Sequence, residues 1–340
     1  MEENKGPSPQ ETSVNPLGKK IFFINLPTSI DKQLLGALHA LEFEAYYIDS
    51  YRETKTILRR HPYSIALIYV DSQLSLSRWF NFICSFKADQ ALSTINLGIM
   101  TSKMTSAERG AFLTKAPIDC GIINLNSSLN GVIHEVLEIL ERLNAKGIRK
   151  YVRSDCMQDP KAVIFWTNQG QVHQMKIVDI SVVGAAVKYP IQNGLLTQKG
   201  AFLENITLVL AKRQIDLAAR VYAVKIAQDS ITLILLFENP SKEAMTAIRS
   251  YASAMLQHIL MTSINGTDLD KNDYSEPDVL SSIVHTIKEK QEAEQKAKEE
   301  REKNASSSGK SSENNENKEL SSPEERGLEP LDENLLGKNS

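Results

Sequence analysis

Two arginines in the second half of the chain have the spacing to act on one ligand. Arg149 and Arg153 belong to the segment RKYVR (149–153). A spacing of four puts both side chains on one side of the chain, whether the segment is extended or helical. A guanidinium group can hold phosphate oxygens, or O6 and N7 of guanine, in a bidentate way, and it can stack on a purine. We therefore expect the two arginines to clamp one ligand together.

A second motif, DISVVG (179–184), supplies the complementary chemistry as the chain enters a new strand. Asp179 can accept hydrogen bonds from the ring N–H and the amino group of a guanine edge. Ser181 lies two residues on, so it points to the same side of a strand and can donate or accept beside it. Gly184 permits a tight turn or a close approach of a ligand. Together the two motifs match a guanine nucleotide with negative phosphates.

An RxxxR element followed, after one hairpin, by (D/N)xSxxG resembles the signature of PilZ domains. The match is complete in Arg149, Arg153, Asp179, Ser181 and Gly184. The resemblance covers about residues 147–262, roughly a third of the chain. It implies a six-stranded barrel that binds cyclic di-GMP, with the arginines on a mobile loop and the Asp-Ser pair on the barrel surface. The bland alternative is a barrel with incidental surface arginines.

The elements that would hold these residues are short strands. After Gly147 the apolar residues recur with a period of two, and Asn168-Gln169-Gly170 and Asn193-Gly194 are turn signals. This pattern predicts a small barrel or sandwich over residues 149–263, plugged or flanked by one helix over about 241–262. The expected strands span 162–168, 171–181, 184–191, 205–211, 217–226 and 230–238.

The first half of the chain follows a different pattern, in which short apolar runs alternate with amphipathic stretches. Five strand-then-helix units predict an α/β domain over residues 19–144, with a parallel five-stranded sheet and helices on both faces. The expected strands span 21–26, 44–48, 64–70, 95–100 and 120–125.

This α/β half resembles a response-regulator receiver domain, but its phosphorylation site is incomplete. Asp71 follows the third strand and Thr101 or Ser102 follows the fourth. Asn25 stands where an acidic pair should hold Mg²⁺, and Asn124 or a neighbour replaces the lysine. We treat Asp71 as a vestigial phospho-acceptor and do not expect conventional phosphotransfer. The alternatives are a pseudo-receiver that serves protein contact or dimerisation, and a different three-layer α/β domain.

Only residues 145–148 separate the two expected domains. Because the arginine segment continues this hinge, we expect ligand capture to change the angle between the domains. The resemblance implies a readout in motility, adhesion, polysaccharide secretion or virulence. The protein partner is not identified; it would bind the α/β domain or the charged C-terminal helix.

Composition narrows the function classes. A formal net charge of −3 argues against a protein that coats DNA, and no apolar run is long enough to span a membrane or act as a signal peptide, so we expect a cytoplasmic protein. Cys84, Cys120 and Cys156 occur singly, which indicates packed thiols and neither a metal site nor a disulfide framework. Residues 1–18 read as a disordered arm, and residues 264–340 as a charged helix, over about 288–303, and a low-complexity tail.

Two other function classes compete with a receptor. An enzyme is disfavoured because the sequence has no GxxxxGK[ST], HExxH or GxSxG motif, and its six histidines are scattered singly. We expect no cofactor and no metal, with cyclic di-GMP as the ligand. A structural adaptor with an unused site is the second competitor, and the intact five-residue signature counts against it.

Overall fold

The structure is a computed structural model that describes residues 17–194, 196–264, 269–275 and 277–308. The expected N-terminal arm and C-terminal low-complexity tail lie almost entirely outside these residues. The chain divides into two compact units, Met1–Lys288 and Glu289–Ser340. The described part of the second unit is the charged end of one helix, whose side chains are exposed as far as Glu302.

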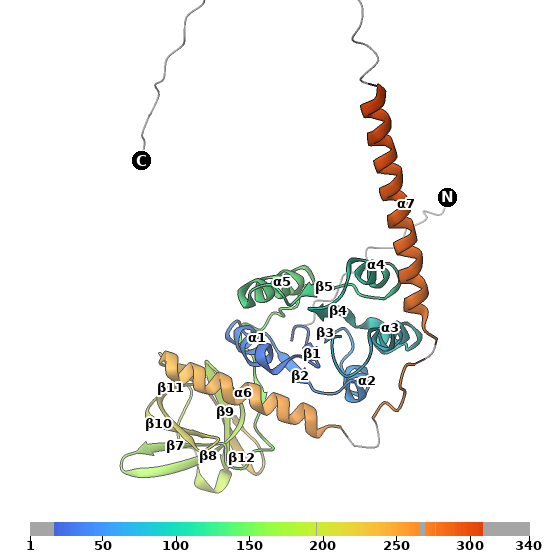
Figure 1. The fold of residues 1–340 in the computed structure, drawn as a ribbon. Coiled ribbons are helices and arrows are strands. Elements are labelled where there is room, and N and C mark those ends of the chain that lie inside the picture. Colours follow the sequence, from blue (N-terminus) through green and yellow to red (C-terminus); the bar gives the residue numbers. More distant parts are fainter. Residues whose placement is uncertain (1–16, 195, 265–268, 276, 309–340) are drawn as a thin grey trace, which may run out of the picture. The chain divides into compact units, whose positions relative to one another are not determined.

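The first half of the chain forms the expected parallel five-stranded sheet (Figure 1). Its strand order is β2-β1-β3-β4-β5, one of the common orders of doubly wound sheets. Strand β1, with the sequence IFFI, is completely buried, as expected for a strand covered on both faces. The strands are β1 (Ile21–Ile24), β2 (Ala45–Ile48), β3 (Ile65–Tyr69), β4 (Asn96–Thr101) and β5 (Gly121–Asn124).

Helices cover both faces of this sheet. One face packs against α1 (Thr28–Ala40) and α5 (Leu129–Arg142), and the other packs against α2 (Tyr51–Arg59), α3 (Leu76–Cys84) and α4 (Ser106–Lys115). Hydroxyl side chains define several helix starts: Ser50, Ser75 and Ser128 each accept a backbone N–H, and Thr105 forms a capping box. Short 3₁₀ turns follow α3 at Ser85–Ala88 and Leu92–Thr94.

The second half forms a closed antiparallel barrel of six strands, as predicted. The strands follow the order β8-β7-β10-β11-β12-β9, and pairing of β8 with β9 closes the ring. A two-residue strand, β6 (Ser154–Asp155), pairs with the outer edge of β8, and a 3₁₀ turn (Ile191–Asn193) follows β9. The barrel strands are β7 (Val163–Asn168), β8 (Gln171–Ser181), β9 (Gly184–Pro190), β10 (Phe202–Leu210), β11 (Arg213–Ile226) and β12 (Ser230–Glu238).

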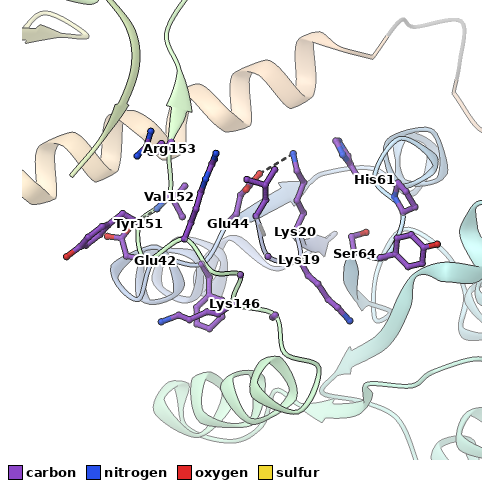
Figure 2. Close-up of a pocket in the computed structure, with 18 of the residues that line it drawn as sticks. Lys19, Lys20, Glu42, Glu44, His61, Ser64, Lys146, Tyr151, Val152 and Arg153 are labelled. Carbon is purple, nitrogen blue, oxygen red and sulfur yellow. Dashed lines mark hydrogen bonds and ion pairs between the residues drawn. The ribbon is translucent and has the colours of Figure 1, made fainter. Parts of the chain in front are cut away.

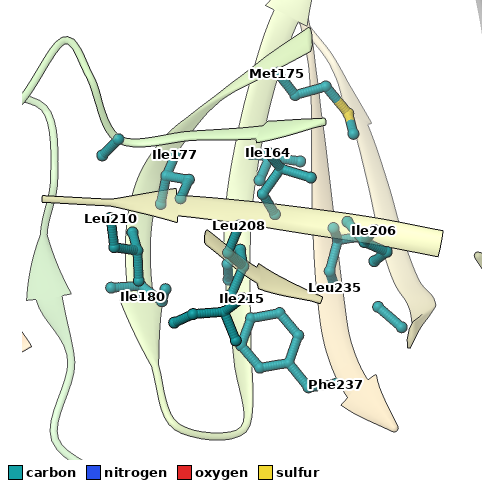
Figure 3. Packing of buried hydrophobic residues seen from close by; sticks show 14 of the residues in the cluster. Ile164, Met175, Ile177, Ile180, Ile206, Leu208, Leu210, Ile215, Leu235 and Phe237 are labelled. Atoms are coloured by element: carbon teal, nitrogen blue, oxygen red, sulfur yellow. The ribbon is translucent and has the colours of Figure 1, made fainter. Parts of the chain in front are cut away.

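Aliphatic side chains fill the barrel interior. Figure 3 shows Ile164, Ile177, Leu208 and Leu235 pointing toward one another from four strands, and all four are completely buried. Because inward and outward positions alternate along a strand, this packing explains the period of two in the sequence. The barrel is therefore a packed core, and a ligand must bind on its outside.

One helix, α6 (Lys242–Thr262), packs on both halves of the first unit. Ala247 and Ile248 belong to the barrel core, whereas Leu260 belongs to the core on one face of the α/β sheet. Its length of 21 residues corresponds to about 31 Å. On the same helix, the Gln257 amide pairs with the edge strand β2, accepting from the N–H of Tyr47 at 3.0 Å and donating to its carbonyl at 2.7 Å. The hinge at residues 145–148 is thus not the only connection between the domains.

The structure differs from the expectation that residues 264–340 form only a charged helix and a tail. Tyr274, which precedes α7 (Val279–Ser308), and Leu280, at the start of this helix, pack against the core formed with α2 and α3. The buried ammonium of Lys55 donates to the hydroxyls of Ser85, at 2.7 Å, and Tyr274, at 2.5 Å, and it lies 3.7 Å from Asp270. Burial lowers the pKa of Lys55. The polar segment that contains Asp270 and Tyr274 is held against the α/β domain because it supplies partners for the buried Lys55 ammonium.

Candidate ligand-binding site

The two predicted arginines lie in an irregular segment between α5 and β6. We call residues 149–153 the arginine loop. Both arginine side chains are exposed, so they can reach a ligand without a change in the protein core. The middle of the loop is held by the N–H of Val152, which donates to Oε2 of Glu42 at 3.1 Å. Glu42 therefore links the arginine loop to the α/β domain.

The structure brings together one residue from each predicted motif. Nη1 of Arg153 lies 4.0 Å from Oδ1 of Asp179, and their side chains are 53% and 38% exposed. The two come close because β6 pairs with β8 directly after the arginine loop, which sets Asp155 opposite Asp179. An exposed ion pair of this kind stabilises a fold by about 0–1 kcal/mol. A ligand that binds both groups can replace it at small cost.

Ser181 and Gly184 make close contacts within the barrel. Ser181 is 3% exposed, and its hydroxyl donates to the carbonyl of Gly184 at 3.3 Å, across the turn between β8 and β9. A Cβ at Gly184 would lie 2.2 Å from the carbonyl oxygen of Leu235 on β12. The glycine is therefore required by the close approach of two barrel strands. The close approach of a ligand at Gly184 stays a prediction.

A cavity of about 440 Å³ opens beside the arginine loop (Figure 2). Its volume is within the range of small-molecule sites, about 300–1,000 Å³. Asp179 does not line it, but Arg153, which lies 4.0 Å from Asp179, does. We call it the basic cavity, because its lining includes Lys19, Lys20, Arg60, Lys146, Arg149 and Arg153.

Two carboxylates also line the basic cavity, and both have cationic partners. Glu42 accepts from Nε and Nη2 of Arg249 at 2.9 and 2.8 Å. Glu44 lies 3.1 Å from the ammonium of Lys20. With six basic and two acidic side chains in the lining, the cavity keeps a positive balance that suits an anionic ligand.

His61, which also lines the basic cavity, is neutral at pH 7. Its ring stacks on Phe22 with 5.5 Å between centroids. Burial and, to a smaller extent, the nearby charge of Lys20 lower the pKa of His61 to about 4. The imidazole therefore adds no charge to the cavity at neutral pH.

The sequence reasoning missed the lysines of this cavity. Lys19 and Lys20 directly precede the first buried strand, and Lys146 lies in the hinge. An adjacent pair of lysines at the entrance to a buried strand was a visible signal. Nothing local indicated that this pair faces the arginine loop, because more than a hundred residues separate the two segments.

Asp71 lies at the carboxyl end of β3, where it was expected, and its carboxylate accepts three hydrogen bonds. The Thr101 hydroxyl donates to Oδ1 at 2.5 Å, while the N–H and hydroxyl of Ser102 both donate to Oδ2 at 2.7 Å. Asn25, in place of an acidic pair, donates to the carbonyl of Tyr69 at 3.0 Å. The receiver resemblance and the role of Asp71 as a vestigial phospho-acceptor both stay predictions.

The cysteines have the burial of packed thiols. Cys120 and Cys156 are buried, which raises the pKa of each thiol to about 12, and Cys84 is half-buried. Among the described residues, no group of three or more His, Cys, Asp or Glu side chains could hold a metal ion. Within the same residues, no helix has both the length and the apolar character needed to cross a membrane.

No protein-family model matches the chain, and no curated protein matches it. Solved structures do match. They include the PilZ domain with c-di-GMP of YcgR from Escherichia coli, at 13% identity and a TM-score of 0.31, covering 34% of this chain and 96% of that one.

Two longer structures also match about a third of the chain. The inhibitor of motility MotI/DgrA of Bacillus subtilis is 24% identical, with a TM-score of 0.25, over 31% of this chain and 48% of that one. The MrkH–c-di-GMP complex of K. pneumonia is 19% identical, with a TM-score of 0.30, over 35% of this chain and 56% of that one. This chain thus spans about half the length of these two proteins.

Proposed function

We propose that the protein is a receptor for cyclic di-GMP and not an enzyme. The observation that carries the proposal is the 4.0 Å approach of Arg153 to Asp179. Arg153 is a cation that can bind a phosphate or a purine, and Asp179 is an acceptor for the guanine edge. The two lie together on the outside of a six-stranded barrel. Arg149 belongs to the same loop and completes the clamp.

The chemistry of each group suits this ligand. Two guanidinium groups can hold phosphate oxygens or stack on a purine. The half-exposed carboxylate of Asp179 can accept from the N1–H and amino group of guanine, a donor pair that adenine lacks on that edge. Gly184 and Ser181 contribute by fixing the turn and strand that carry Asp179.

The site is tested by calorimetry with cyclic di-GMP on three proteins. Arg153→Ala is expected to raise Kd about 10- to 150-fold, because a charge-assisted contact is worth about 1.5–3 kcal/mol. Arg213→Ala is the matched control, since Arg213 is an exposed arginine at the start of β11 and does not line the basic cavity. Unimpaired binding by Arg153→Ala would mean that the site is misplaced. Recovery of intact ligand after incubation tests the absence of turnover.

We also propose that binding changes the angle between the α/β domain and the barrel. The arginine loop is at once the ligand clamp and the end of the hinge, and Glu42 holds it at Val152. A loop that closes on a nucleotide must shift this contact, and the α6 contacts then move with it. Small-angle scattering with and without cyclic di-GMP tests this; identical profiles at saturating ligand would rule out the rearrangement.

The output of the receptor is, in this proposal, altered contact with a protein partner through the α/β domain or the charged helix. The PilZ resemblance suggests motility, adhesion or virulence as the process. A pull-down with and without cyclic di-GMP tests whether such a partner responds to the ligand.

A further inference from the structure

Lysines of the α/β domain face the same cavity as the arginine loop. Lys19 and Lys20 precede β1, and together with Lys146 of the hinge they line the basic cavity that Arg149 and Arg153 also line. Figure 2 shows Lys20, Lys146 and Arg153 among the side chains that line this cavity. The cavity thus combines cations from two domains.

The contacts of these lysines leave positive charge in the cavity. The Lys19 ammonium donates to a neutral partner, the amide oxygen of Asn96, at 3.2 Å. The Lys146 ammonium lies 5.0 Å from the centre of the Phe43 ring, which also carries no net charge. Lys20 has Glu44 at 3.1 Å, with side chains 36% and 22% exposed, so an anion must displace this carboxylate. The Lys19 and Lys146 ammonium groups contact neutral partners and can bind an anion directly.

The types of cation differ across the cavity in a way that suits a cyclic dinucleotide. Planar guanidinium groups stack on bases and bind in a fork, whereas ammonium groups act as compact point charges for phosphate oxygens. A ligand with two phosphodiesters presents two negative charges on one ring. The arginines can therefore bind a base of the ligand while the lysines bind a phosphate.

We propose that the α/β domain takes part in ligand binding, with Lys19, Lys20 and Lys146 holding a phosphate of the cyclic dinucleotide whose guanine is read from the barrel side. This inference rests on the proposed function. It makes the ligand a bridge between two domains, and it assigns the α/β domain a binding role in addition to protein contact. Glu44 then loses its lysine partner to the phosphate when the ligand binds.

Lysine footprinting tests this on the full chain. The protein is acetylated briefly with and without saturating cyclic di-GMP, and each lysine is quantified by mass spectrometry. We expect labelling of Lys19, Lys20 and Lys146 to fall about 10-fold with ligand. Lys32 and Lys115, exposed lysines on α1 and α4 outside the cavity, are expected to keep their labelling.

A second measurement distinguishes direct contact between the lysines and the ligand from mere shielding of the lysines from acetylation. Calorimetry on Lys20→Gln/Lys146→Gln is expected to show about 10-fold weaker binding of cyclic di-GMP, with Lys32→Gln/Lys115→Gln unchanged. If the wild type binds and both the footprint and the double variant are unaffected, this inference fails while the proposed function stands. If the wild type does not bind, the proposed function itself fails.

Discussion

Glu42 and Arg249 form a largely buried ion pair between the α/β domain and helix α6, with side chains 11% and 24% exposed. Both Nε and Nη2 of Arg249 donate to one carboxylate oxygen, at 2.9 and 2.8 Å, and the other oxygen accepts the N–H of Val152 at 3.1 Å. One carboxylate therefore joins the α1–β2 loop, helix α6 and the arginine loop.

Glu42→Gln is expected to loosen the arginine loop. The substitution removes the charge that pairs with Arg249, and it should lower the free energy of unfolding by about 1–3 kcal/mol. Hydrogen exchange at the Val152 amide is expected to become faster. Urea unfolding and exchange mass spectrometry measure these effects, with Glu141→Gln as an exposed control on α5. Unchanged exchange at Val152 would show that Glu42 does not hold the loop.

Gly184→Ala is expected to destabilise the barrel through β12. The added Cβ would lie 2.2 Å from the Leu235 carbonyl oxygen, so one strand must shift, at a cost of about 1–3 kcal/mol or more. Gly36→Ala on α1 is the control, because a Cβ there meets nothing within 4 Å. Thermal unfolding measures both. Weaker ligand binding by Gly184→Ala with no loss of stability would instead assign the glycine to the ligand.

Asp71 is expected to resist phosphorylation. Three hydrogen bonds occupy its carboxylate, and Asn25 supplies no negative charge to hold Mg²⁺ beside it. Intact mass spectrometry after incubation with acetyl phosphate and Mg²⁺ should show no added phosphoryl group. A gain that disappears in Asp71→Asn would establish a working receiver.

The stability of the protein is expected to fall as the pH drops from 6.5 towards 4. The pKa of His61 is lowered from 6.5 to about 4 in the fold, so the unfolded chain binds a proton in this window that the folded chain does not. His61→Gln should show a shallower loss of stability in this range, and His39, whose pKa burial also lowers, should account for part of what remains. His134→Gln, at an exposed position on α5, should behave as the wild type. Denaturant unfolding across the pH range measures the slopes, and equal slopes in all three would contradict the assignment.

Local patterns predicted most of the fold. Completely apolar runs such as IFFI identify strands covered on both faces, and the period of two around Ile164 and Ile177 identifies a barrel whose interior is packed. The spacing of Leu280, Ile283, Val284 and Ile287 is also helical, and it indicates the packed start of α7 that the charged residues downstream obscured.

The candidate site was predictable only in part. The two motifs identified Arg153 and Asp179, which lie close together in the structure. They are close because β6, directly after the arginine loop, pairs with β8, and only one hairpin separates the two motifs in the sequence. The basic cavity was not predictable, because Lys20 approaches the arginine loop through tertiary packing. The close contact between Gly184 and the Leu235 carbonyl was not predictable either. A glycine in a motif does not reveal which neighbouring atom occupies the space beside it.

The most direct test of the account is calorimetric titration of the wild-type chain with cyclic di-GMP and, in parallel, with cyclic di-AMP. The two ligands share their phosphates and differ at the base edge that Asp179 would read. We expect saturable binding of cyclic di-GMP and binding of cyclic di-AMP that is weaker by about 100-fold or more. Absence of binding heat with cyclic di-GMP, or equal affinity for both ligands, would contradict it.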